Sequence, residues 1–248
     1  MAKQSGLGDN LYVAGYDLSG DIGSLGGLSG GPTALEVTGI DKSAMERIGG
    51  LRDGKLEFTA FFNKATDRAH LRLSTLPTAD VITSYFRGTT LGNPSANIVA
   101  KQIGYNGTRA DDGAMTFAVE AQANGYGVEW GRSLTAGKRT DTTATNGSSV
   151  DFGTGSTAFG LQAYLHVFAF TGTSVTVKLQ ESSDNGGADA WADVTGGAFT
   201  AATGVTSERI ATSAGQTVER YLRVVTTGTF SNAVFAVSVV RNDTAVSF

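Results

Sequence analysis

Few residues of this 248-residue chain have the types and spacings that carry out chemistry. The two histidines, His70 and His166, lie far apart in the sequence, and neither belongs to an HExxH motif or has a third ligand at metal-binding spacing. Cysteine is absent, which excludes thiolate nucleophiles, disulfides and cysteine-based metal sites. We interpret both histidines as ordinary surface or hydrogen-bonded side chains.

Three other segments resemble functional motifs in composition but not in spacing. The glycine-rich run 20–31 contains no GxGxxG and no Lys-Ser/Thr ending, so it does not predict a phosphate site. The segment 153–157 lacks the glycine that a nucleophile elbow needs two places after its serine. Oxygen ligands for calcium are densest at 184–193, but their spacing is not that of an EF-hand; they are Asp184, Asn185, Asp189 and Asp193. We therefore predict no catalytic, cofactor-binding or metal-binding residue, and we expect that the chain is not an enzyme.

Aromatic residues of the second half leave two interpretations open. Tyr164, Phe168 and Phe170, with Trp191 elsewhere, could form a platform that stacks on sugars, or they could fill a core. Both faces of the segment 161–170 are apolar, so this strand is expected to be central in a sandwich or to lie against a partner.

Composition favours a β protein that does not hold nucleic acid. The chain is 40% hydrophobic and 17% charged, and its 34 glycines suit strands joined by many tight turns. A net charge of −4 argues against affinity for phosphate backbones. No apolar run reaches the roughly 20 residues that span a bilayer, and the start has no apolar signal core, so we expect a soluble protein made without export.

The elements expected before residue 133 are mostly strands. Strict alternation predicts strands at 55–63 and 114–123, each with one apolar face. A brief helix is expected at 42–48 and one of about three turns at 66–76, ahead of Pro77. The first 35 residues form a glycine-rich arm, which could order on a neighbouring subunit or dock locally as a strand.

The sequence between residues 133 and 149 is polar and aperiodic, which indicates a linker. Strands with polar turns follow it, as expected for a sandwich. The predicted fold class is thus mainly β: residues 1–147 form a sandwich or barrel domain with one flanking α-helix, and residues 148–248 form a second all-β sandwich.

Several segments resemble the major tail tube proteins of long-tailed, siphovirus-type actinobacterial phages. They are Leu35–Ala44, Gly49–Gly54, Gln122–Gly131, Leu161–Leu165 and Phe168–Val177, and together they extend over nearly the whole chain. The resemblance implies a tube domain that forms stacked, hexameric rings, with the second domain on the tube exterior. It also implies a tape measure protein and a tail terminator as partners. The location it implies is the virion tail, assembled in the host cytoplasm.

The function expected is therefore that of a structural tube subunit that associates with itself and conducts double-stranded DNA during ejection without binding it. The main alternative is a virion decoration or carbohydrate-binding β-sandwich protein. A hydrolase of cell-wall polymer is a weaker alternative, because no pair of acids is placed recognisably for it. No membrane partner is expected. If the tube surrounds a lumen, the polar faces of the two alternating strands are its candidate lining, with Glu57, Thr59, Thr116, Glu120 and Gln122. Carboxylates repeated around the bore would repel the phosphates of DNA.

Overall fold

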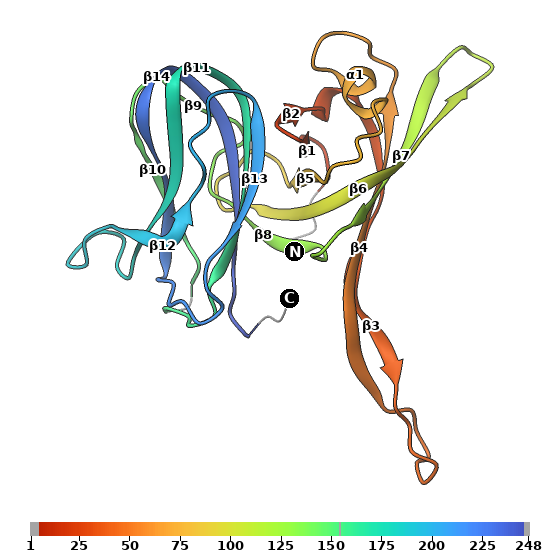
Figure 1. Ribbon diagram of the computed structural model, residues 1–248, viewed down its shortest axis with the longest axis horizontal. Helices are drawn as coiled ribbons and strands as arrows, with labels where there is room; N and C mark the ends of the chain where they lie inside the picture. Colours follow the sequence, from red (N-terminus) through yellow and green to blue (C-terminus); the bar gives the residue numbers. More distant parts are fainter. Residues whose placement is uncertain (1–4, 154, 246–248) are drawn as a thin grey trace. The chain divides into compact units, whose positions relative to one another are not determined.

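The computed structural model describes residues 5–153 and 155–245, and almost all of its regular structure is β-strand (Figure 1). This confirms the mainly β fold class. The described residues contain one α-helix, α1 (Ala69–Leu73), and one turn of 3-10 helix at Ser19–Asp21. The strands are β1 (Asn10–Val13), β2 (Tyr16–Asp17), β3 (Ile22–Glu36), β4 (Arg47–Phe61), β5 (Val81–Phe86), β6 (Pro94–Arg109), β7 (Met115–Ala123), β8 (Glu129–Ser133), β9 (Arg139–Asp141), β10 (Asn146–Asp151), β11 (Leu161–Ser182), β12 (Ala192–Ala198), β13 (Thr206–Ala211) and β14 (Tyr221–Arg241).

The described chain divides into two compact units. Unit 1 comprises the described residues of 1–20, 82–97 and 130–247, and unit 2 comprises those of 21–81 and 98–129. Segments on both sides of the predicted boundary at 147/148 thus fold together in unit 1. The roles predicted for 1–147 and 148–248 stay predictions. The first four residues of the arm and Thr154 lie outside the described residues.

Unit 1 is organised by the antiparallel pairing of β11 with β14, which runs from Leu161 opposite Arg241 to Ser182 opposite Tyr221. Its register shifts three times between Val167 and Ser174. Such bulges bend a strand and increase its local twist. The other strands attach to this pair: β12 and β13 lie beside β11, and β8, β9 and β10 lie beside β14.

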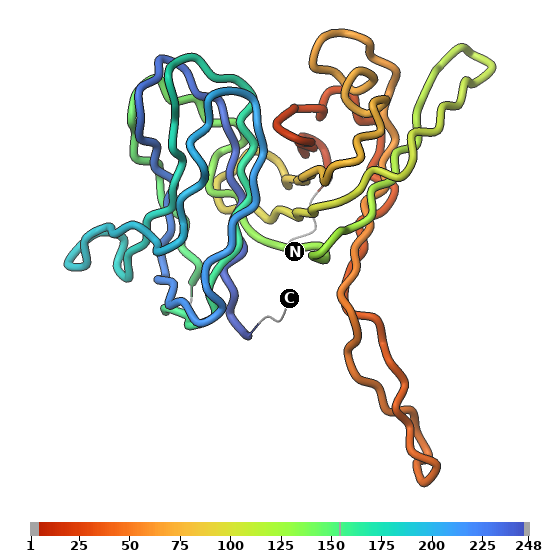
Figure 2. Tube along the Cα trace, viewed as in Figure 1, coloured from red at the N-terminus to blue at the C-terminus, as the bar shows by residue number. Residues whose placement is uncertain are grey.

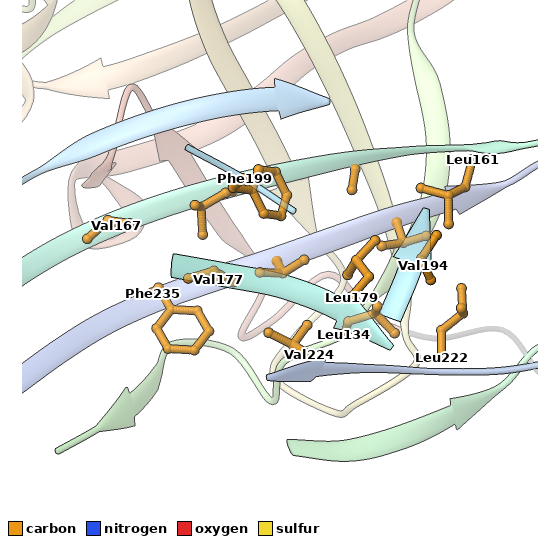
Figure 3. Packing of buried hydrophobic residues seen from close by; sticks show 14 of the residues in the cluster. Leu134, Leu161, Val167, Val177, Leu179, Val194, Phe199, Leu222, Val224 and Phe235 are labelled. Atoms are coloured by element: carbon orange, nitrogen blue, oxygen red, sulfur yellow. The ribbon is translucent and has the colours of Figure 1, made fainter. Parts of the chain in front are cut away.

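The bend brings the two halves of each long strand onto one hydrophobic core (Figure 3). Alternate residues of both halves of β11 are fully buried there, among them Leu165 before the bulges and Val177 after them. A straight strand of this length could not place both in one cluster, because each residue adds about 3.3 Å. Unit 1 therefore contains the predicted sandwich, and its two sheets come from the same long strands.

The other face of the first half of β11 is buried as well, under N-terminal strands of unit 1. Tyr164 and His166 are fully buried, and the Tyr12 ring on β1 lies 4.8 Å from the ring of Phe168. Strand β1 pairs with β2 and with β5. Of the two interpretations of β11, a central position is correct. For residues 10–17 of the arm, docking as a strand is correct.

The segment 133–149 is not a linker. It contains β9 and the start of β10, both of which pair with β14. Asp141 is buried and accepts hydrogen bonds from Arg139 Nε (2.8 Å), from Arg139 Nη2 (2.7 Å) and from Thr226 Oγ1 (2.7 Å). The polar side chains of the segment 133–149 thus form hydrogen bonds within the fold, so their polarity does not indicate a solvated linker.

Unit 2 is an antiparallel sheet in the order β3, β4, β7, β6. The alternation predicted for β4 and β7 is confirmed, since Leu56, Phe58 and Ala60 are buried on one face with Phe117 and Val119 of the neighbouring strand. Helix α1 lies against this apolar face. The His70 ring lies 5.9 Å from that of Phe117, and its Nδ1 lies 2.9 Å from the Tyr105 hydroxyl.

Both helix predictions need correction. The helix expected over 66–76 spans only Ala69–Leu73, because Asp67 (φ 62°) and Leu76 (φ 44°) adopt left-handed conformations that a helix excludes. Its first N–H donates to the buried Asp21 carboxylate (3.1 Å), a cap supplied by a distant segment. The helix expected at 42–48 is absent from the described residues. Ile48 pairs instead with Leu35 in the ladder of β3 and β4.

Gly228 is required at the bend of β14. Its φ of 124° is in the region that favours glycine, and a Cβ there would overlap the Ser174 carbonyl oxygen of β11. We expect Gly228→Ala to destabilise the protein by about 1–3 kcal/mol in urea denaturation. Gly215→Ala is the control, because a Cβ at that exposed glycine has open space and should leave the midpoint unchanged. Equal midpoints for the two variants would contradict this role.

His166 predicts a pH dependence of stability. Its Nδ1 accepts from the Gly15 N–H (3.2 Å), so the neutral ring donates from Nε2 to Ser84 Oγ (3.0 Å). Burial lowers the pKa of His166 from 6.5 to about 3. The unfolded chain thus binds a proton below pH 6.5 that the folded chain does not, and stability falls by up to about 1.4 kcal/mol per pH unit as the pH drops.

Urea titrations between pH 7 and pH 5 measure this loss. The variant His166→Gln should be less stable at pH 7 but should lack this part of the pH slope. The control His70→Gln retains His166 and should keep it. Identical slopes for the His166→Gln variant and the native protein would refute the assignment.

Candidate functional site: the polar face and long hairpin of unit 2

The predicted lining residues lie together on the polar face of the unit 2 sheet. In the register of β4 with β7, Glu57 stands directly opposite Glu120, Phe61 opposite Thr116, and Lys55 opposite Gln122. Thr59 stands opposite Ala118. Directly opposed residues share a face, and this face is opposite to the one that carries Leu56 and Phe58. The structure therefore brings all five predicted residues together, while their position in a lumen stays a prediction.

An ion-pair cluster occupies the centre of this face. Lys55 Nζ lies 2.6 Å from Glu120 Oε1 and 2.9 Å from Glu57 Oε1. Glu120 first, and Glu57 second, raise the pKa of Lys55. Two carboxylates opposed across strands would repel each other, and the ammonium between them offsets that repulsion. The three side chains are partly exposed, so solvent screens the pairs, and the cluster keeps an excess of one negative charge.

Two further acids extend the negative character of the face. Gln122 Nε2 donates to Asp53 Oδ2 (3.1 Å), two residues before Lys55 on β4. Lys101 of β6 stands opposite Gln122, but its Nζ lies 2.8 Å from Asp80 Oδ1. Hydrogen bonding to Lys101, and then to Asn124, lowers the pKa of Asp80. Each base here therefore has at least one acidic partner.

Strands β3 and β4 continue as a hairpin beyond the point where β7 ends. The last register pair between β4 and β7 is Lys55 with Gln122. Over the earlier part of β4, from Arg47 to Asp53, the described pairing is with β3 alone. The trace in Figure 2 shows this hairpin leaving the rest of unit 2 as two adjacent strands. A second, shorter hairpin of β6 and β7 extends past the opposite end of β4, where Arg109 pairs with Met115.

The long hairpin exposes apolar side chains. Leu51 is 85% exposed, and Leu35 and Ile48, which face each other across the ladder, are 48% and 55% exposed. Exposed apolar residues of the same segment also include Val37, Ile40 and Met45. Single exposed apolar residues are normal, whereas a succession of them on one projecting element is typical of an interaction surface. We define this set, 35–51, as the hairpin tip.

Strand β3 forms an edge of the sheet and carries little charge, although Pro32 and three register shifts interrupt it. Twelve of its 15 residues have a register partner, all on β4, and its single charged residue is Glu36 at the end. Soluble monomers normally place lysines or other charges on such an edge to prevent pairing with another chain. Pro32, which has no N–H to donate, is consistent with an edge position. Unit 2 thus offers two features suited to association, an edge strand whose single charge is at its end and a tip with exposed apolar side chains.

Other residues singled out in the sequence serve the fold. The Asp184 carboxylate accepts from the backbone N–H of Gly187 (2.8 Å) and of Ala188 (2.6 Å), and backbone hydrogen bonds lower its pKa. Asp193 pairs with Lys178 (2.6 Å). Tyr164 is buried in unit 1, and the Arg223 guanidinium lies 4.4 Å from the centre of the Trp191 ring. These positions make the core interpretation correct for Tyr164 and cover one face of Trp191.

Neither a metal site nor a membrane-spanning helix is found in the part of the chain that the structure describes. Across residues 5–153 and 155–245, no three His, Asp or Glu side chains are grouped so that they could share a metal ion. Within the same ranges no helix has the length and apolar character needed to cross a bilayer.

Sequence reasoning missed the hairpin tip. The apolar residues at 35–51 have neither helical nor strict strand periodicity, and the helix expected at 42–48 falls among them. One feature of the sequence could have indicated the tip. Apolar residues recur between Gly39 and Gly54 without the periodicity that would bury them within their own chain, and the structure exposes them. The bridging position of Lys55 is likewise not evident from the sequence.

Comparisons with known proteins give matches among solved structures only. No protein family and no curated protein matches the chain. A chain from the tail of an empty gene transfer agent particle with C6 symmetry is 13% identical, with a TM-score of 0.39, over 50% of this chain and 96% of that one. The Dit (gp 19.1) protein of phage SPP1 is 12% identical, with a TM-score of 0.31, over 93% and 98%. A chain of the phage p2 baseplate is 10% identical, with a TM-score of 0.35, over 96% and 99%. At these values the matches assign neither fold nor function.

Proposed function

We propose that this protein is a structural subunit that polymerises with copies of itself, as the tube of a phage tail. The observation that carries the proposal is the hairpin tip of unit 2, which presents apolar side chains to solvent at the end of an edge strand whose single charged residue is Glu36. A protein that functions alone would expose this surface at a cost of about 25 cal/mol per Å² of apolar area, and association with another copy removes that cost.

The position of the tip favours a repeating assembly over a closed dimer. The tip projects from one end of the pair β4 and β7, and the shorter hairpin of β6 and β7 projects from the other end. A tip that docks on a different surface of the next copy makes a head-to-tail contact. Contacts of that kind generate rings or open filaments, whereas a dimer interface must be self-complementary.

The resemblance of the sequence to major tail tube proteins supports the kind of assembly. Under this proposal the subunits form stacked, hexameric rings in the virion tail, the sandwich of β11 and β14 lies on the tube exterior, and double-stranded DNA passes through without specific binding. A tape measure protein and a tail terminator are the partners that the resemblance implies. The role is structural and not enzymatic.

The hairpin tip is tested by the substitution Leu51→Glu. A charge at this exposed position should abolish polymers in electron micrographs and in sedimentation, because it cannot be buried in the contact between copies. Folding should be unaffected, since Leu51 is 85% exposed in the single chain, and the urea midpoint should match that of the native protein.

Val205→Glu provides the matched control, because Val205 is an exposed aliphatic residue of unit 1, outside the hairpin tip. It should polymerise normally. Tubes of normal length from the Leu51→Glu variant would contradict the role of the tip. Discrete particles from the native protein under all conditions would overturn the tube and favour a decoration protein.

The polar face of unit 2 is proposed to line the lumen. What supports this is the acidic excess around Lys55, which repeated by ring symmetry would form a bore that repels phosphate. The double variant Glu57→Gln with Glu120→Gln leaves Lys55 unopposed and reverses the sign of the cluster. In virions that still assemble, DNA release at low salt should slow, because each exposed lysine can bind phosphate and release counterions.

The control variant Asp193→Asn with Asp243→Asn makes the same change of net charge at two exposed carboxylates of unit 1, each of which pairs with a base. Virions of this control variant should release DNA at the same rate as native virions. Unchanged release from the Glu57→Gln, Glu120→Gln virions would refute the lumen assignment and leave the tube proposal standing.

A further inference from the structure

Arg223 of β14 is a partly buried cation that lacks a carboxylate partner. Other arginines of unit 1 have one, since Arg139 pairs with Asp141 and Arg241 pairs with Asp243. Arg223 forms no ion pair with any residue that the structure describes. Burial lowers the pKa of Arg223, so the fold penalises its charged form, and no described acid offsets that penalty. An anion from outside the chain can supply the missing charge.

Two neighbours hold the Arg223 guanidinium in place. Its Cζ lies 4.4 Å from the centre of the Trp191 ring, and its Nε and Nη2 both donate to Gln180 Oε1, at 3.0 and 2.7 Å. Gln180 stands directly opposite Arg223 in the ladder of β11 and β14. These contacts use one edge of the guanidinium. The edge formed by Nη1 and Nη2 is left, and it can donate two parallel hydrogen bonds to a carboxylate.

The Gln180 amide is itself oriented by a further pair of side chains. Its Nε2 donates to Asp193 Oδ1 (2.9 Å), so its oxygen has to face Arg223. Asp193 also accepts from Lys178 Nζ (2.6 Å), and this hydrogen bond is the main cause that lowers the pKa of Asp193. The Asp193 carboxylate thus binds Lys178 and Gln180 and is not the counter-ion of Arg223. The network holds the guanidinium in position without neutralising it.

Hydroxyl and amide groups lie on the other side of Arg223. Ser149 of β10 stands directly opposite Arg223, and its Oγ donates to Asn185 Oδ1 (2.6 Å). The Nδ2 group of Asn185 makes no hydrogen bond to any residue within the described ranges, so it can donate to a ligand. Leu222 and Val224, on either side of Arg223 in the sequence, are buried in the core. Arg223 is therefore on the outer face of the sandwich.

We propose that Arg223 is the centre of a binding site for the carboxylate of an acidic sugar. The site accepts one negative charge, because the neighbouring bases are already paired, Lys178 with Asp193 and Arg220 with Asp151. An acidic peptide is usually recognised by a cluster of unpaired bases. The hydroxyl and amide groups of β10 and the turn after β11 suit the hydroxyls of a sugar instead. This site does not rest on the proposed tube, since none of its residues belongs to the hairpin tip.

The fluorescence of Trp191 measures binding at this site. The chain has two tryptophans, so in the variant Trp130→Phe the indole beside Arg223 is the sole tryptophan. Titration of this full-length variant with potassium glucuronate should give a saturable change in emission, measured against potassium chloride at equal ionic strength. Glucose has a similar ring without the carboxylate and should give no change.

Substitutions in the Trp130→Phe background identify the binding group. Arg223→Gln should weaken glucuronate binding about tenfold or more, the effect of losing a charged hydrogen-bonding partner. Arg223→Lys keeps the charge but cannot donate two parallel hydrogen bonds from one plane, so it should also bind more weakly. Arg132→Gln is the matched control, because it removes the same charge from an exposed arginine of β8, and it should bind normally. Urea midpoints verify that each variant is folded.

Four results would overturn the inference. The first is the absence of a saturable change with glucuronate, and the second is equal affinity of the Arg223→Gln and Arg132→Gln variants. The third is binding of acetate as tight as that of glucuronate, because the sugar ring would then contribute nothing. The fourth is tighter binding of a polyglutamate peptide, which would assign the site to a protein partner.

Discussion

The antiparallel ladder between β11 and β14 is the interaction on which the rest of unit 1 depends. Each of the strands β8, β9, β10, β12 and β13 pairs with one of these two, and the core between the two sheets consists largely of their inward-facing residues. The bulges near Gly172 are what allow one ladder to form both sheets, because they bend the strands back over their own side chains. The first half of β11 is then buried on both faces, and this recruits β1 and β5 into the same unit.

In unit 2, side chains also alternate between the two faces of the sheet, but only one of these faces is buried. Its sheet buries one face under α1 and an aromatic cluster, while the opposite face stays polar around Lys55. Beyond Gly54 the two strands β3 and β4 lose their third neighbour, and the side chains of the tip have no cover within the sheet. A hairpin of this kind is stable only as an extension of a larger sheet. The folding of one chain therefore does not explain its exposed apolar residues, and this is the basis of the proposed association.

Most of the carboxylates described here accept hydrogen bonds from backbone N–H groups or form ion pairs with bases. Asp21 caps α1, Asp184 closes the turn before β12, and Asp141 joins Arg139 to β14. This accounts for an acidic protein whose described residues contain no grouped metal ligands. The cluster of Glu57, Glu120 and Lys55 differs from these, because its partly exposed side chains keep a net negative charge. That difference is the electrostatic basis on which we propose the polar face, and not the turns, as the lining of a lumen.

The sequence by itself determined the mainly β class and the two faces of the strands at 55–63 and 114–123, because side chains alternate with a period of two whatever the surroundings. It also placed Glu57, Thr59, Thr116, Glu120 and Gln122 on polar faces for the same reason. Tertiary structure alone decided the elements that depend on distant partners. Residues 47–48 became strand because β3 lies beside them, 139–141 and 146–151 became strands because β14 supplies their hydrogen bonds, and α1 begins where Asp21 accepts its first N–H. The local sequence cannot predict these elements, because the hydrogen bonds that form each of them come from residues far away along the chain.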